Sequence, residues 1–186
     1  MGLIIEDGKG KGTKAGVDLE GRLVTTSIIS TSEHHANHCN KNAYNLFISA
    51  TPTGAGDCFL YLKNTYEIDL VIEGFSIWLA ANEYIDFYID DTGSPVGGID
   101  IIPINLNSGS ANSADGIFQK ANDITGLVPG NLAERYRHAT ANGSNVFNFE
   151  QDIILVKNGI FTAYIGTGGT ALEMNLYFNY HNCSDV

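Results

Sequence analysis

The chain has 186 residues, of which 44% are hydrophobic, and carries a formal net charge of −11. This hydrophobic content suits one domain with a packed core and excludes a disordered polypeptide. The negative charge argues against nucleic acid and against an anionic membrane surface as partners, because both require clustered lysine and arginine. No apolar run reaches the roughly 18 residues that a membrane-spanning helix needs.

Residues 1–21 have the composition of an extended arm, with six glycines interspersed with charged residues. Such a segment cannot bury enough surface to fold alone, so it is either disordered or ordered by lying on a partner. Four carboxylates balance the cations of residues 1–22, and residues 23–186 therefore carry all of the net negative charge. We expect an arm over residues 1–21 and a single domain over residues 22–186. The cations of the arm are Lys9, Lys11 and Lys14, and Arg22 follows directly after the arm.

From residue 22 onward, β-branched and apolar residues recur in short runs separated by turn-forming residues. Gly74 predicts a bulge within the longest run. The last run alternates, and it should place Leu172, Met174, Leu176 and Phe178 on one face. Strands are expected at residues 23–29, 44–49, 58–63, 68–79, 84–89, 99–106, 132–139, 146–149, 152–157, 160–165 and 171–180.

The segments between these runs predict turns and loops. Residues 51–56, 91–95 and 107–115 have turn or loop composition, and residues 116–131 are less regular, with a short helical turn as one interpretation. Asn158-Gly159 is the strongest hairpin signal. Helices do not alternate with the strands, so we expect an all-β antiparallel β-sandwich, jelly-roll-like in topology.

A histidine-rich segment is the main candidate for metal binding. Imidazole and thiolate ligands suit zinc or copper, but a structural zinc site usually draws on two separated pairs of ligands. Cys58 and Cys183 lie far away in sequence, so we interpret the segment as a polar loop or interface and expect no cofactor. The three cysteines include no CxxC pair and are expected as reduced thiols. The four candidate ligands are His34, His35, His38 and Cys39.

Two other patterns hint at chemistry without meeting its spacing. Asp86, Asp90, Asp91 and Asp100 suggest a calcium site or acid–base pairs, but the regular calcium-loop spacing and its terminal glutamate are missing. Residues 166–170 resemble a phosphate loop, yet they lack the Lys-Ser/Thr pair and precede a strand. We therefore interpret them as acidic turn residues and a hairpin turn. No G-x-S-x-G motif occurs, and no catalytic residue is predicted.

Aromatic residues leave a second function open. Trp78 is the only tryptophan, and Tyr84 and Tyr88 flank Asp86 in an expected strand. Core packing is the favoured interpretation, because aromatic residues dominate β-sheet cores. If instead these rings are exposed, they would form a platform for sugars.

Three stretches resemble a known group of proteins. They are GTKAGVDLEGRL at residues 12–23, FLYLKNT at 59–65 followed by IDLVIE at 68–73, and PINLNSGSAN at 103–112. Together they resemble virion structural proteins of tailed bacteriophages that decorate or cement the capsid. The resemblance covers about half of the chain and includes no catalytic motif.

The resemblance implies a non-enzymatic protein on the capsid surface of the virion, made in the host cytoplasm. It also implies a β-sandwich body that assembles symmetrically, often as a trimer, and an N-terminal arm. The expected partners are the major capsid protein, contacted by the arm with Lys9, Lys11, Lys14 and Arg22, and sister subunits. The alternative is a carbohydrate- or receptor-binding module of a phage fibre or lectin-like protein.

Overall fold

The computed structural model describes residues 16–17, 23–24 and 41–181. The chain divides into two units, residues 1–31 and residues 32–186. In the first unit, β1 (Gly16–Val17) pairs antiparallel with β2 (Leu23–Val24). The rest of the expected arm, with Lys9, Lys11, Lys14 and Arg22, lies outside the described residues.

The second unit is all-β in its described part. No helix long and apolar enough to cross a bilayer occurs among the residues that the structure describes. The strands of this unit are β3 (Ala43–Ala50), β4 (Cys58–Asn64), β5 (Asp69–Leu79), β6 (Glu83–Ile89), β7 (Thr92–Val96), β8 (Ile99–Asp100), β9 (Ile104–Asn105), β10 (Gly116–Lys120), β11 (Thr125–Val128), β12 (Asn131–His138), β13 (Gly143–Leu155), β14 (Ile160–Ile165) and β15 (Leu172–His181).

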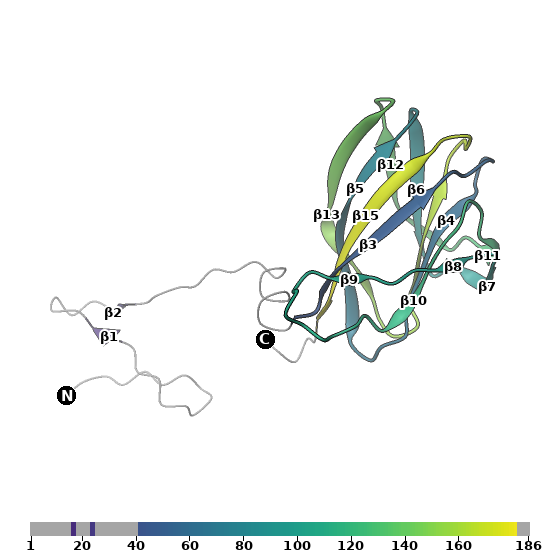
Figure 1. Ribbon diagram of the computed structural model, residues 1–186. Coiled ribbons are helices and arrows are strands. Elements are labelled where there is room, and N and C mark those ends of the chain that lie inside the picture. The colour runs from purple at the N-terminus through teal and green to yellow at the C-terminus, as the bar shows by residue number, and fades with distance from the viewer. Residues whose placement is uncertain (1–15, 18–22, 25–40, 182–186) are drawn as a thin grey trace. The chain divides into compact units, whose positions relative to one another are not determined.

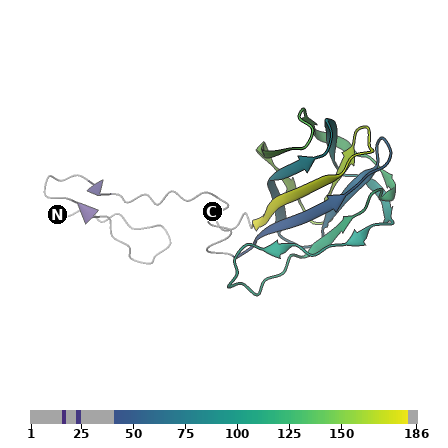
Figure 2. The same ribbon diagram turned by 45° about the horizontal axis from the view of Figure 1, so that its top comes forward.

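These strands form two large antiparallel sheets and one small pair. The six-stranded sheet has the order β12-β6-β14-β4-β10-β8, and the five-stranded sheet has the order β13-β5-β15-β3-β9. Strands β11 and β7 pair separately. Both large sheets are open at their edges, so the fold is not a closed barrel. Figures 1 and 2 show β15 and β3 side by side along the five-stranded sheet.

The two sheets pack face to face over one apolar core. Alternation along β3 and β15 sends one face inward, and Leu172, Met174, Leu176 and Phe178 are all buried as predicted. Phe75 of the five-stranded sheet lies 5.0 Å, between ring centroids, from Phe87 of the six-stranded sheet. Contacts of this kind join the layers, and burial of these rings supplies much of the driving force for folding.

A smaller apolar cluster lies apart from the main core. Cys58, Tyr61 and Tyr164 from β4 and β14 pack with Ile124, which precedes β11, and Leu127 of β11 is half-buried against them. The β7–β11 pair therefore contributes apolar contacts of its own to the six-stranded sheet.

Gly74 marks a bulge, as its position predicted. The register of β5 shifts at this point against both β13 and β15. A Cβ atom at Gly74 would lie 2.4 Å from the backbone oxygen of Phe147, so the close approach of β13 requires glycine.

Two predictions of local structure are wrong. Residues 91–95 were expected as a turn, but β7 occupies Thr92–Val96 and pairs with β11. The helical turn considered for residues 116–131 is replaced by β10 and β11. Pairing with strands distant in sequence decides these short segments, because their local preferences are weak.

The predicted hairpins at Asn158-Gly159 and at residues 166–169 also need correction. Asn158 does adopt the positive φ of a tight turn, at 68°. The flanking strands β13 and β14, however, belong to different sheets, and the same is true of β14 and β15. Turn chemistry fixes the local reversal of the chain but does not choose the partner with which the next strand pairs.

Candidate functional surfaces

An apolar ridge runs along one edge of the packed sheets. Ile99, Ile102, Ile104 and Leu106 all expose their side chains, with exposed fractions of 65%, 88%, 62% and 47%. Ile101, within the same segment, packs inward against the core. Scattered exposed apolar residues are normal, but four exposed apolar residues within eight positions of one segment are a concentration of the kind that marks an interaction surface.

The ridge lies where both sheets end. Strand β8 is the last strand of the six-stranded sheet, β9 is the last of the five-stranded sheet, and the ridge segment passes from one to the other. Each of these strands has only two residues, and Pro103 between them lacks a backbone N–H. This edge is therefore poorly suited to adding a further strand, and it offers apolar side chains instead.

A groove of about 690 Å³ lies at the opposite edge of the two sheets, between β12 and β13. Apolar side chains line much of it, including Phe147, Phe149 and Ile154. Two carboxylates, Glu134 and Asp152, also line it. We call it the edge groove.

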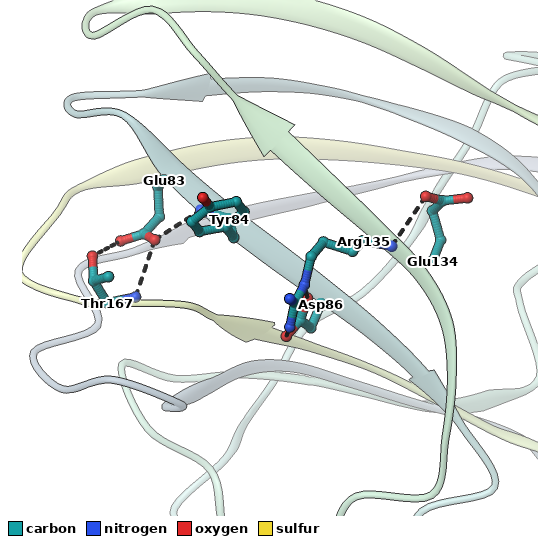
Figure 3. A network of polar contacts seen from close by, with 6 residues as sticks. All are labelled: Glu83, Tyr84, Asp86, Glu134, Arg135 and Thr167. Atoms are coloured by element: carbon teal, nitrogen blue, oxygen red, sulfur yellow. Dashed lines mark hydrogen bonds and ion pairs between the residues drawn. The ribbon is translucent and has the colours of Figure 1, made fainter.

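A polar cluster occupies β6 and β12 of the six-stranded sheet. Arg135 donates two hydrogen bonds to Asp86, Nε to Oδ1 at 2.5 Å and Nη2 to Oδ2 at 2.7 Å. The guanidinium carbons of Arg135 and Arg137 lie 5.8 and 5.6 Å from the centre of the Tyr84 ring. Tyr84 is 40% exposed, so core packing, the interpretation favoured for the aromatic residues, does not hold at this ring. Figure 3 shows Tyr84 with Asp86 and Arg135. We call these four residues the arginine–tyrosine cluster.

An open pocket of about 420 Å³ adjoins this cluster at Asp86. Tyr88, Tyr164 and Leu127 supply its aromatic and apolar lining, and Asp123 adds a second carboxylate. Aromatic rings beside hydrogen-bonding groups are the usual composition of a small-ligand pocket. Trp78 does not contribute to it, since it lies partly buried on β5 of the other sheet.

The glycine-rich loop at residues 166–169 binds a carboxylate of the protein itself. Buried Glu83 accepts hydrogen bonds from the backbone N–H groups of Thr167 and Gly168, at 3.0 and 3.1 Å, and from the Thr167 hydroxyl at 2.5 Å (Figure 3). The loop therefore has the anion-binding geometry that its glycines suggested. The N–H groups of Thr167 and Gly168 already donate to the Glu83 carboxylate, so they are not available to bind a phosphate.

Asp91 is buried and holds three elements together. It accepts hydrogen bonds from the Thr162 hydroxyl and the Tyr164 hydroxyl, both at 2.8 Å, and from the backbone N–H of Gly130 at 2.9 Å. A carboxylate satisfied by three donors in this way is a structural anchor. Asp91 lies in the turn between β6 and β7, as predicted, but its burial was not predicted.

The aspartates considered for a calcium site, and interpreted as acidic turn residues, do not converge. Asp86 pairs with Arg135, Asp91 is buried among its three donors, and Asp100 accepts from Gln119 at 2.9 Å. Within the described residues, no three His, Cys, Asp or Glu side chains lie close enough together to hold a metal. The candidate ligands His34, His35, His38 and Cys39 lie outside the described residues.

The segment PINLNSGSAN forms a clamp on the chain where it enters β3. The Asn105 side-chain amide donates to the backbone oxygen of Lys41 at 2.8 Å, and Ser110 Oγ donates to the same oxygen at 3.3 Å. Asn112 donates to the side-chain oxygen of Asn42 at 2.9 Å. This asparagine clamp holds the backbone at Lys41 and Asn42 just before β3, a role that no motif signal in the sequence revealed.

Cys58 is a free cysteine, as expected of a reduced thiol, and it is buried in the smaller apolar cluster. Burial raises the pKa of its thiol from 9.0 to about 12. A thiol held protonated in this way is a poor nucleophile. Cys39 and Cys183 lie outside the described residues.

Comparisons of the chain with protein-family models, with curated proteins and with solved structures found no match. The surfaces described above are therefore the basis for an argument about function.

Proposed function

We propose that the chain is a non-enzymatic structural protein of a virion, of the type that decorates or cements a bacteriophage capsid. In this proposal it assembles with sister subunits through the apolar ridge. The exposure of Ile99, Ile102, Ile104 and Leu106 on one open edge carries the proposal. Exposure of these four side chains to water does not stabilise an isolated chain, so their grouping favours a partner surface that covers them.

Strand order supports a jelly-roll topology for the two packed sheets. Eight long strands divide four to a sheet, in the orders β12-β6-β14-β4 and β13-β5-β15-β3. Successive strands of this set alternate between the sheets except at β6 and β12, which pair with each other in the six-stranded sheet. Jelly rolls of viral capsid and lectin domains likewise divide eight strands between two packed sheets. Because one architecture hosts many functions, this order is compatible with a virion protein without deciding between functions.

The free energy released when the ridge is buried determines how much of it a partner must cover. Full burial of an isoleucine or leucine side chain contributes about 1.5–3 kcal/mol, so the exposed parts of these four, which are 47–88% exposed, supply on the order of 4–8 kcal/mol. Association costs roughly 4–15 kcal/mol in lost freedom of motion. A surface that covers the ridge only in part is therefore insufficient, and the partner must enclose it or add further contacts.

We assign attachment of the protein to the capsid to the arm. Residues 1–21, with Lys9, Lys11, Lys14 and Arg22, would contact the major capsid protein. Deletion of residues 1–21 should abolish co-sedimentation with capsids that lack the protein, while the circular dichroism of the β-sheets persists. Unchanged co-sedimentation would show that the arm is not the anchor.

Light scattering on the full chain tests assembly through the ridge. We expect a defined oligomer, with a trimer favoured, and a monomer for Ile102→Glu. Val128→Glu is the matched control, because Val128 is similarly apolar and 62% exposed but lies on β11. A full chain that stays monomeric at every concentration would refute the proposed assembly.

The arginine–tyrosine cluster favours a second candidate function, the binding of a carbohydrate or receptor. Tyr84 offers an exposed ring, and Asp86 with Arg135 offers acceptors and donors beside an open pocket. A glycan array tests this function, with Tyr84→Ala expected to remove any binding. Tyr66→Ala is the control, since Tyr66 has a similar exposure of 38%. An array without binders would count against this function.

A further inference from the structure

The charges around the apolar ridge differ from those around the edge groove. Lys120 lies opposite Ile99 in the pairing of β10 with β8. Asp100, next to Ile99 in β8, accepts a hydrogen bond from the side chain of Gln119 at 2.9 Å. The asparagine clamp holds the backbone of Lys41 beside Asn105 of the ridge segment. Neither Lys120 nor Lys41 forms an ion pair with any described residue. One edge of the protein thus combines apolar side chains with two lysines that have no ion-pair partner among the described residues, and its carboxylate, Asp100, accepts a hydrogen bond from Gln119.

The edge groove carries the complementary features. Phe147, Phe149 and Ile154 give it an apolar lining, and Glu134 and Asp152 give it negative charge. Asp152 is exposed and has no hydrogen-bond or ion-pair partner among the described residues. The groove is concave, whereas the ridge projects, with Ile102 almost wholly in solvent.

We propose that the chain assembles head to tail, with the apolar ridge of one copy seated in the edge groove of the next. This inference rests on the proposed function, because it names the partner of the ridge. Apolar surface then meets apolar surface, and lysines meet carboxylates. Two copies of a chain with a net charge of −11 repel each other elsewhere, so a contact that brings together these edges is favoured over other orientations.

Placement of the two surfaces at opposite edges has a consequence for symmetry. A heterologous contact of this kind leaves one ridge and one groove free in every open chain of subunits. It therefore closes into a ring when the rotation between copies allows, and the expected trimer is such a ring. An isologous contact, ridge against ridge, would stop at a dimer and would leave the groove unused.

Complementation between variants tests the head-to-tail contact on full-length protein. Ile102→Glu removes a working ridge and leaves the groove intact. Ile154→Arg removes a working groove, because it places a cation where the lysines of the next copy would lie. We expect each variant alone to be monomeric in light scattering, and an equimolar mixture to form a 1:1 heterodimer and nothing larger. Ala133→Arg, in the same groove, is a second groove variant, and circular dichroism checks that each is folded.

The outcomes separate this inference from the function on which it rests. Wild-type assembly of both groove variants, with Ile102→Glu monomeric, would overturn the head-to-tail contact and leave assembly through the ridge standing. A mixture that stays monomeric at rising concentration would also overturn the head-to-tail contact. A monomeric wild-type chain would overturn assembly through the ridge itself.

Discussion

Glu83 and Thr167 lie 84 residues apart in sequence, and the carboxylate of the first accepts both the backbone N–H and the hydroxyl of the second. This contact fixes the loop that carries the chain from β14 in one sheet to β15 in the other. Gly168 in that loop has a φ of 78°, and a Cβ atom there would lie 2.4 Å from the backbone oxygen of Gly54. The loop therefore combines a conformation that favours glycine with an internal anion that satisfies its N–H groups.

Replacement of Glu83 by glutamine should destabilise the protein by about 1–3 kcal/mol, because the buried carboxylate accepts charge-assisted hydrogen bonds that an amide serves less well. Urea denaturation measures the change in the free energy of unfolding. Glu173→Gln is the control, since Glu173 is exposed on β15. Equal stability of the two variants would contradict an anchoring role for Glu83.

Replacement of Asp91 by alanine should lower the free energy of unfolding by about 2–5 kcal/mol. The Thr162 and Tyr164 hydroxyls and the Gly130 N–H would then lose their buried acceptor. Asp90→Asn is a suitable control, because Asp90 is exposed and asparagine tolerates its positive φ of 62°. Thermal unfolding of the two variants provides the comparison. A melting temperature for Asp91→Ala equal to that of the control would contradict the buried anchor.

Replacement of Asn105 by alanine should loosen the chain at Lys41 without unfolding the sheets. Its amide makes hydrogen bonds to the backbone oxygens of Lys41 and Asn112, and both would be lost. Hydrogen exchange at the start of β3 should speed up, while exchange in β5 and β15 stays slow. Ser108→Ala, in the same loop at an exposed position, should leave the exchange rates of β3 and of the central strands unchanged. Unaltered exchange in Asn105→Ala would rule out the clamp.

Stability should fall in alkaline solution. Burial raises the pKa of the Cys58 thiol from 9.0 to about 12, and it also raises the pKa values of Tyr44, Tyr61, Tyr164 and Tyr180. The folded protein therefore keeps protons that the unfolded chain releases. The stabilisation is complete below about pH 9 and is lost as pH rises towards the folded values.

Each such group should lower the free energy of unfolding by about 1.4 kcal/mol per pH unit above its ordinary pKa. Urea denaturation at pH 8, 9 and 10 measures this slope. Cys58→Ala should reduce the slope between pH 9 and 10, whatever its effect on stability at pH 8. Parallel pH profiles for the wild type and this variant would show that the thiol does not titrate on unfolding.

Alternation and turn residues in the sequence determined much of the local structure. The runs that became β3, β4, β6 and β14 were predicted nearly to their ends, because β-branched and aromatic residues in short alternating runs have no competing structure. The bulge at Gly74 was predicted for a similar reason, since glycine inside a strand weakens it unless another backbone approaches closely.

Tertiary structure alone decided which strands pair and which polar residues are buried. Asn158-Gly159 specifies a tight turn, but only packing of the whole chain sends β13 and β14 into different sheets. Asp91 and Glu83 read as ordinary acidic residues, because the donors that satisfy them lie some 40 to 85 residues away. The apolar ridge was likewise predicted as one strand, 99–106. Its exposure follows from a position at the edge of both sheets, which no local pattern records.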